Sequence, residues 1–168
     1  MAAFERAVTI TLDKEGGFRH NNVTGEVVNH GITLNFVRNS GYHPDADEAF
    51  IRNLSVAEAT DIYRCYFWNR YSIGSINNQE LANKAFDTTV NMGPAALTLL
   101  QSAMNALGGQ CVTDGMLGPI SIAQINSLDA RPLLAEFKRL AAERYRQIAA
   151  DNPDLAEQLA DWLARLNS

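Results

Sequence analysis

Glu15 is the residue in this 168-residue sequence whose type and position best suit catalysis. It follows Thr11 by four residues and Leu12 by three, so it continues the apolar stripe of a predicted helix and lies at that helix's C-terminal end. The helix dipole there and partial burial both disfavour a charged carboxylate. A carboxyl group that keeps its proton near neutral pH can act as a general acid. The alternative is an ordinary last-turn glutamate that reaches solvent.

Two glycines, Gly16 and Gly17, follow Glu15 and end the predicted helix, and they leave space for a ligand to approach the backbone. Turn-forming pairs at 21–22 and 24–25 come next, and a short β-branched run stands at 27–28. This pattern favours a small β-hairpin or an extended loop over residues 18–32.

Polar side chains stand where this hairpin should return toward Glu15, at Asn29, His30 and Thr33. The hydroxyl of Thr33 could hold a water molecule or orient Glu15. It could equally cap a short helix that begins at Leu34, and the two roles are compatible. His30 is typical of a partly exposed loop residue.

Helical periodicity dominates the rest of the chain and predicts a mainly α fold. A first helix begins by Phe4 and ends at the two glycines, and Ser55 with Glu58 forms a capping box for another. Further helices are predicted over 34–39, 55–71, 81–90, 94–107, 119–127, 133–148 and 155–166. The length suits one domain, residues 1–168.

The composition excludes several classes of protein. Hydrophobic residues make up 46% of the chain and charged residues 20%, which is typical of a globular domain and not of a disordered or fibrous chain. The net charge is −5 and no basic face is visible, so we expect no nucleic-acid partner. No apolar run approaches the roughly 20 residues that span a bilayer, so we expect no membrane insertion.

The N-terminal residues and the histidines carry two further expectations. Residues 1–12 lack the uninterrupted apolar stretch of a cleavable signal peptide, so we expect synthesis in the cytoplasm and another route to any outside site of action. His20, His30 and His43 lie neither four apart on a helix nor beside a cysteine pair, so we expect no metal site.

Four groups of residues, in order along the chain, carry a resemblance to a known family. They are Glu15-Gly16-Gly17-Phe18 with Gly31-Ile32-Thr33; Ile62-Tyr63-Arg64 with Tyr66 and Trp68; Phe86-Asp87 with Val90-Asn91 and Gly93; and Gln101 and Ala106-Leu107-Gly108 with Asp114-Gly115 and Gly118-Pro119. The set resembles the E-G-G-Y…G-I-T, I-Y-R-x-x-Y-W, F-D-x-x-V-N-x-G and A-L-G…D-G-x-x-G-P signatures of glycoside hydrolase family 108. The resemblance covers most of the chain.

This family contains N-acetylmuramidases of phage-endolysin and secretion-activator type. The resemblance implies a lysozyme-like helical fold, no cofactor, and peptidoglycan glycan strands as the partner. It implies hydrolysis of the β-1,4 bond between N-acetylmuramic acid and N-acetylglucosamine, with Glu15 protonating the departing oxygen. It also implies a catalytic half at 1–93 and a peptidoglycan-binding-like half at 94–168. Without a signal peptide, a holin or an export machinery would carry the protein to the wall.

The second catalytic group is the point at which the sequence departs from its relatives. Many of them carry Asp-Pro-Gly-Gly where this chain has residues 21–26, and related phage-type lysozymes have an aspartate where this chain has Thr24. Glu26 is the one carboxylate left in the segment. Three alternatives follow: Glu26 replaces the aspartate, a water molecule is held by Thr24, Asn29 or Thr33, or activity is weak or lost.

Two more residues are candidates for substrate binding. Asn91 follows Asp87 by four residues on one face of a predicted helix, where a buried polar pair must be hydrogen-bonded. The pair either ties down the loop after Glu15 or offers the Asn91 amide to a sugar. Trp68 lies off the apolar stripe of its aromatic segment, which leaves its ring available to stack on a sugar.

Three other functions fit the same residues. A non-catalytic peptidoglycan-binding or secretion-accessory protein would bind walls without releasing soluble fragments. A lytic transglycosylase also uses one glutamate and leaves 1,6-anhydro ends, where a hydrolase leaves reducing ends. A helical interaction protein without any connection to the wall would not bind purified sacculi.

Overall fold

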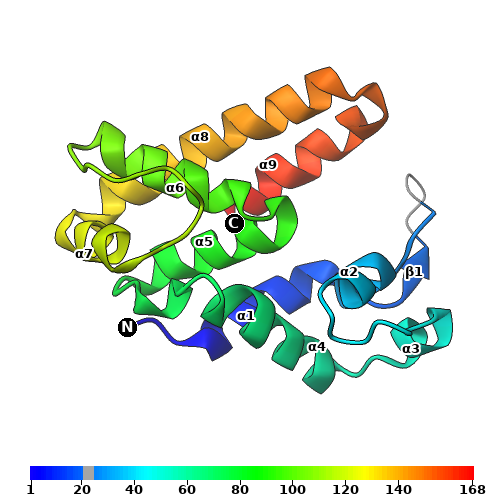
Figure 1. Cartoon of the computed structure of the whole chain (residues 1–168). Coiled ribbons are helices and arrows are strands. Elements are labelled where there is room, and N and C mark those ends of the chain that lie inside the picture. Colours follow the sequence, from blue (N-terminus) through cyan, green and yellow to red (C-terminus); the bar gives the residue numbers. More distant parts are fainter. Residues whose placement is uncertain (21–24) are drawn as a thin grey trace.

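The computed structural model of the chain describes residues 1–20 and 25–168. Helices dominate it, and a small sheet lies beyond the end of the first helix (Figure 1). The helices are α1 (Phe4–Glu15), α2 (Leu34–Asn39), α3 (Glu48–Asn53), α4 (Val56–Tyr63), α5 (Gln79–Met92), α6 (Ala95–Ala106), α7 (Pro119–Ser127), α8 (Ala130–Asp151) and α9 (Leu159–Asn167). Thr24, named above as a possible holder of a water molecule, lies outside the described residues.

The predicted hairpin is present and is part of a three-stranded antiparallel sheet. Its strands are β1 (Arg19–His20), β2 (Val27–Asn29) and β3 (Ile32–Thr33), in the order β1-β2-β3. Val28 pairs with Arg19 on one side and with Thr33 on the other. Because β2 and β3 are joined by two residues with positive φ, His30 and Gly31, the chain reverses tightly there.

Local sequence signals place most helix starts correctly. The capping box of Ser55 and Glu58 is present at the start of α4, and α2 spans the predicted residues. The sequence reading missed α3, which Asp47 caps, because six residues are too few to show a helical period. Residues Arg64–Asn69, expected as α-helix, form a π-helix that continues α4.

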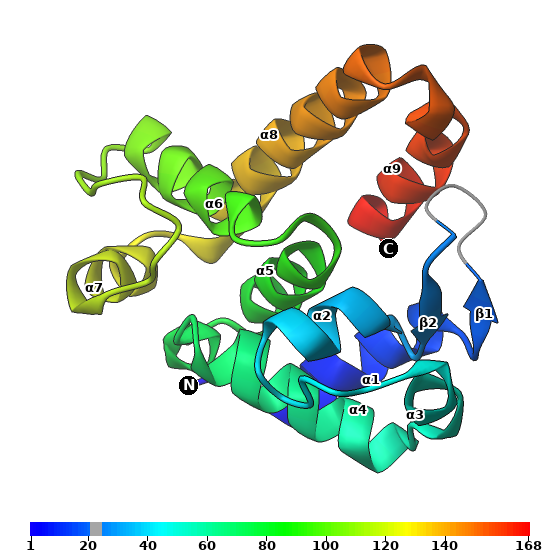
Figure 2. The ribbon, with the colours of Figure 1, turned by 45° about the vertical axis from the view of Figure 1, so that its right-hand side comes forward.

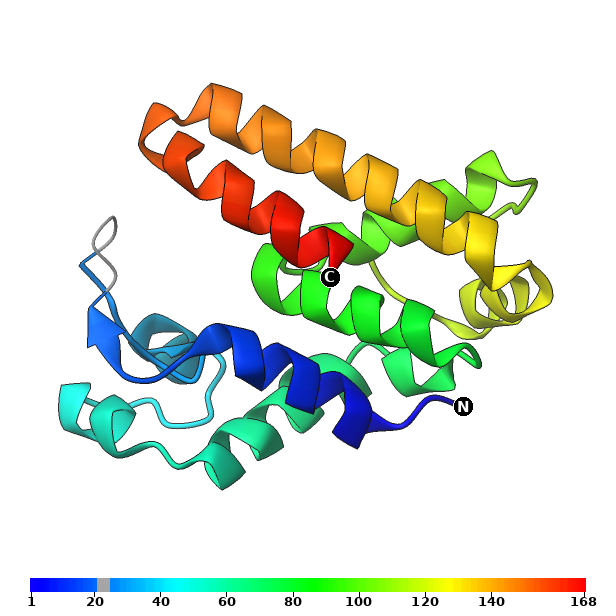
Figure 3. The same ribbon diagram turned by 180° about the vertical axis from the view of Figure 1, so that it is seen from behind.

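The helices form two groups with α1 and α5 between them (Figure 2). The sheet, α2, α3 and α4 lie on one side, and α6 to α9 lie on the other. α6 packs against α8, and α8 and α9 pair as an arm in which α9 runs back toward α5 and α1 (Figure 3). Lys84 of α5 and Lys14 of α1 both reach Ser168, so the last residue of the chain lies against these two helices.

One large apolar core holds the chain together. It includes Phe4 of α1, Tyr63 of α4, Phe86 of α5 and Phe137 of α8, all nearly inaccessible to solvent. Burying large side chains such as these contributes about 1.5–3 kcal/mol each. The core contains residues from both sides of position 93 in the sequence. The division into a catalytic half and a peptidoglycan-binding half stays a prediction.

Within residues 1–20 and 25–168, no helix combines the length and the apolar character of a membrane span. The same part of the chain holds no cluster of three or more His, Cys, Asp or Glu side chains suited to a metal ion.

Candidate active site

Glu15 is the last residue of α1, and its carboxylate lies between Arg165 of α9 and the turn at Gly31. Gly16 ends the helix with a φ of 70°, as the two-glycine pattern predicts. The Glu15 side chain keeps 12% of its exposure. Arg165, 150 residues further along the chain on α9, donates from Nη2 to Glu15 Oε1 at 2.6 Å. The expectation for Glu15 from the sequence did not include this cation beside its carboxylate.

Arg165 also donates hydrogen bonds to Asp87 of α5. Its Nε lies 3.2 Å from both carboxylate oxygens of Asp87, and its Nη2 lies 2.8 Å from Oδ1. The Arg165 side chain is 15% exposed and that of Asp87 is 3% exposed. Burial disfavours the cation, but hydrogen bonding to Asp87 and the charge of Glu15 raise the pKa of Arg165 above its ordinary value. Arg165 is therefore a permanent cation shared by two carboxylates.

Two residues of α1 complete the surroundings of Asp87. Lys14 Nζ lies 3.3 Å from Asp87 Oδ2, and Thr11 donates from Oγ1 to Oδ1 at 3.2 Å. The predicted tie through Asp87 therefore exists, but it joins α5 to α1 and α9 and not to the loop after Glu15. We call Glu15, Asp87, Arg165 and Lys14 the carboxylate–arginine network.

The other side of Glu15 rests on the turn between β2 and β3. A Cβ atom placed on Gly31, whose φ is +76°, would lie 2.6 Å from Glu15 Oε2 and 2.4 Å from the hydroxyl oxygen of Tyr63. Tyr63 is buried and donates to the carbonyl of His30 at 2.8 Å. Burial first, and then the charge of Glu15, raise the pKa of Tyr63 well above its ordinary value. Arg19 of β1 donates to the backbone carbonyl of Glu15.

Thr33 and Glu26 both cap α2. Thr33 Oγ1 accepts from the backbone N–H of Phe36 at 3.1 Å, which confirms the capping role predicted for it. Glu26 Oε1 accepts from the N–H of Asn35 at 2.7 Å. Because both acceptors serve the first turn of one helix, they stabilise its start. A role for either side chain toward substrate stays a prediction.

Asn29 ties the sheet to α3. Its Nδ2 donates to the carbonyl oxygens of Ile51 at 3.0 Å, of Arg52 at 3.3 Å and of Leu54 at 3.3 Å. The residue is buried, so its amide satisfies backbone groups that would otherwise be unpaired. Sequence reasoning placed Asn29 beside Glu15 and missed this structural role, because its partners lie more than twenty residues away.

Trp68 lies in the core, contrary to the expectation of a ring available to ligand. It is 6% exposed and packs edge-to-face against Phe4 and Phe86, at centroid distances of 5.6 and 5.7 Å. The prediction assumed an α-helix, in which Trp68 falls off the apolar stripe. In the π-helix each turn takes more residues, so Trp68, five after Tyr63, faces the core as Tyr63 does.

Asn91 joins α5 to α8. Its Oδ1 accepts from the hydroxyl of Tyr145 at 2.6 Å, while the residue as a whole is exposed. Burial raises the pKa of Tyr145 to about 12, so its hydroxyl stays a donor. Asn91 lies one turn beyond Asp87, and its use in sugar binding stays a prediction.

Among the hollows lined by the described residues, two have different relations to the carboxylate–arginine network. One, of about 330 Å³, shares Lys14 and Asp87 with the network and is lined further by Lys84 and Lys138. The other, of about 580 Å³, lies between α2, the π-helix and the end of α5. Its lining residues are Phe36, Asn39, Ser40, Tyr66, Phe67, Arg70, Tyr71, Val90, Gly93 and Pro94. The second hollow combines aromatic side chains with polar groups.

Comparison with known proteins places this geometry in context. The family model described as Glycosyl hydrolase 108 matches residues 8–93, which include Glu15, Gly31 and Asp87 but not Arg165. No curated protein matches the chain. The structure of SagA from Brucella abortus has a TM-score of 0.76 and 21% sequence identity, over 97% of this chain and 92% of that one. This likeness supports the predicted lysozyme-like, mainly α fold.

Proposed function

Because this chain belongs to the glycosyl hydrolase 108 family, we propose that it cleaves the β-1,4 bond between N-acetylmuramic acid and N-acetylglucosamine, with Glu15 as the general acid. Membership of the family supports the broader statement that the protein is a glycoside hydrolase acting on peptidoglycan. The bond and the residue roles are our proposal. The position of Glu15 carries it: a largely buried carboxylate at the end of α1, held between Arg165 and the Gly31 turn.

The proposed reaction begins with transfer of the Glu15 proton to the glycosidic oxygen. As the bond from the anomeric carbon to that oxygen breaks, its electron pair passes to the oxygen, and positive charge develops on the sugar. A carboxylate or a held water molecule must then meet that charge. Asp87 is the carboxylate joined to Glu15 through Arg165, but it is 3% exposed and bound on several sides, which argues against direct contact with a sugar. Glu26 and a water molecule held by Thr33 stay the alternatives.

Digestion of purified sacculi tests the proposal. The wild type should release fragments with N-acetylmuramic acid reducing ends, and Glu15→Gln should release none, because the amide keeps the shape of the side chain and lacks the acid proton. Asp13→Asn is the matched control, since Asp13 is an exposed carboxylate on the same helix. Mass spectrometry of the products identifies the cleaved bond.

The other outcomes identify the rival functions. Equal digestion by the wild type and Glu15→Gln would remove Glu15 from the reaction. Products with 1,6-anhydro ends would make the protein a lytic transglycosylase. Binding to sacculi without release of fragments would make it a wall-binding accessory protein. Since peptidoglycan lies outside the cytoplasm, the proposal includes a holin or an export route.

A further inference from the structure

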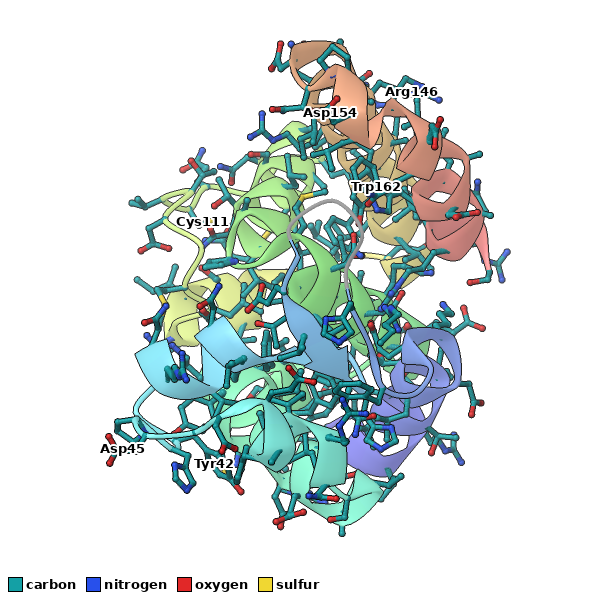
Figure 4. The ribbon with its side chains drawn as sticks, turned by 90° about the vertical axis from the view of Figure 1, so that its right-hand side faces the viewer. Tyr42, Asp45, Cys111, Arg146, Asp154 and Trp162 are labelled. Carbon is teal, nitrogen blue, oxygen red and sulfur yellow. The ribbon has the colours of Figure 1, made fainter. Side chains whose placement is uncertain are left out.

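The C-terminal helix α9 is fixed so that Arg165 meets Glu15. Trp162, one turn before Arg165, stacks on Tyr145 of α8 with ring centroids 5.2 Å apart, on the inner side of the arm (Figure 4). Lys84 of α5 donates to the carbonyls of Arg165 and Ser168, at 2.9 and 3.1 Å. The stacking fixes the ring of Trp162, and the hydrogen bonds from Lys84 fix the backbone of Arg165.

The guanidinium of Arg165 is fixed in turn by Asp87. Three of the four contacts between Arg165 and carboxylate oxygens go to Asp87, and one goes to Glu15. Asp87 is itself held by Thr11 and Lys14. The planar guanidinium of an arginine depends on its hydrogen-bond partners for its orientation, so removing one partner reorients it. The ammonium of a lysine acts as a point charge and does not depend on orientation in this way. Thr11 and Lys14 thus fix Asp87, Asp87 fixes the guanidinium of Arg165, and the guanidinium contacts Glu15.

We propose that Arg165 is a positioning residue for Glu15, held in place by Asp87, so that α9 completes the active site from outside the segment that matches the family model. This inference rests on the proposed function of Glu15. Arg165 and the Gly31 turn hold the two carboxylate oxygens from opposite sides, with Oε1 on the guanidinium and Oε2 against the turn. The orientation of the proton donor is therefore set before substrate arrives, which is how a positioned acid lowers a barrier.

Charge supplies a second role for the same contact. When Glu15 gives up its proton it becomes an anion, and Arg165 lies 2.6 Å away to pair with it. Asp87 shares the charge of Arg165, so the protonated acid does not face an unshared cation. Among the residues that the structure describes, the charged and titratable groups around Glu15 are Lys14 on α1, Arg19 on β1, Tyr63 on α4, Asp87 on α5 and Arg165 on α9.

The test compares Arg165→Gln, Arg165→Lys and the wild type by kcat and KM on soluble glycan fragments of peptidoglycan, across pH. We expect kcat of Arg165→Gln to fall about tenfold to a hundredfold with little change in KM. We expect the alkaline limb of its pH–rate profile to move to higher pH, because the positive charge beside the Glu15 carboxylate is gone. Arg165→Lys keeps the charge without the fork, so its kcat should recover in part and its limb should stay in place.

Arg139→Gln is the matched control, because Arg139 pairs with Glu136 and Glu143 on the exposed face of α8. Circular dichroism establishes that each variant is folded, and Arg165→Lys carries the test if Arg165→Gln is not. If folded Arg165→Gln has the kcat of the wild type and the same alkaline limb in its pH–rate profile, the proposal is overturned. A rise in kcat would also overturn it and make α9 an inhibitory clamp. An inactive wild type would instead count against the proposed function.

Discussion

Glu15 and Gly31 are in such close contact that Gly31 has no room for a side chain. A Cβ atom there would lie 2.6 Å from Glu15 Oε2. The contact joins the end of α1 to the turn between β2 and β3, and it explains why a glycine stands at a position that the family resemblance also marks. The carboxylate is thus bounded by backbone on one side and by Arg165 on the other.

Gly31→Ala should therefore disturb both stability and activity. The new methyl group meets Glu15 and the Tyr63 hydroxyl, and the left-handed backbone adds strain of about 1–3 kcal/mol. We expect activity on sacculi to fall by more than about tenfold, because Glu15 is displaced. Gly41→Ala is the control, since Gly41 has a φ of +79° and nothing within 4 Å of its Cβ position. Equal loss in both variants would attribute the effect to backbone strain alone.

Asp87→Asn should destabilise the fold strongly. The change leaves Arg165 buried and Lys14 half-buried beside a neutral amide, and breaking a buried ion pair in this way costs about 3–5 kcal/mol. Urea unfolding followed by circular dichroism measures the loss. Glu143→Gln, which removes one partner of an exposed pair with Arg139, should change the free energy of unfolding by at most about 1 kcal/mol. Similar losses in the two variants would contradict the importance of the network.

Stability should rise with pH through the titration of Lys84. Burial, with a smaller contribution from the charge of Lys14, lowers the pKa of Lys84 from 10.5 to about 8. Between these values the unfolded chain binds more protons than the folded one, so the free energy of unfolding increases with pH. The neutral amine keeps two N–H donors for the carbonyls of Arg165 and Ser168.

Urea unfolding across that pH range checks the Lys84 prediction. Lys84→Met should lack the rise, whereas Lys138→Met, which removes another lysine from the same hollow, should retain it. A wild type whose stability is flat or falls between pH 8 and 10.5 would contradict the prediction.

Trp68→Phe separates packing from ligand binding. Because Trp68 is buried between Phe4 and Phe86, we expect a loss of stability and an unchanged KM for glycan fragments. Thermal unfolding and steady-state kinetics measure the two effects. A raised KM with unchanged stability would return Trp68 to the substrate-binding residues.

Local signals in the sequence were sufficient for much of the fold and for the central residue of the site. The two glycines end α1 directly after Glu15, Ser55 and Glu58 cap α4, and Thr33 caps α2, because each device acts within one turn of helix. The order of the motifs from Glu15 to Gly93 was enough to indicate the family, and the family model covers the same stretch.

Tertiary structure decided the partners of those residues. Trp68 faces the core because its segment forms a π-helix. Asn29 donates to backbone carbonyls of α3. Arg165 follows Trp162 by three residues in an amphipathic helix, a pattern equally typical of a surface residue. Arg165 and Glu15 are 150 residues apart in the sequence, and their contact depends on how the arm of α8 and α9 packs back toward α1. Helix caps follow from neighbouring residues, whereas an ion pair at that separation depends on the packing of every helix between its partners.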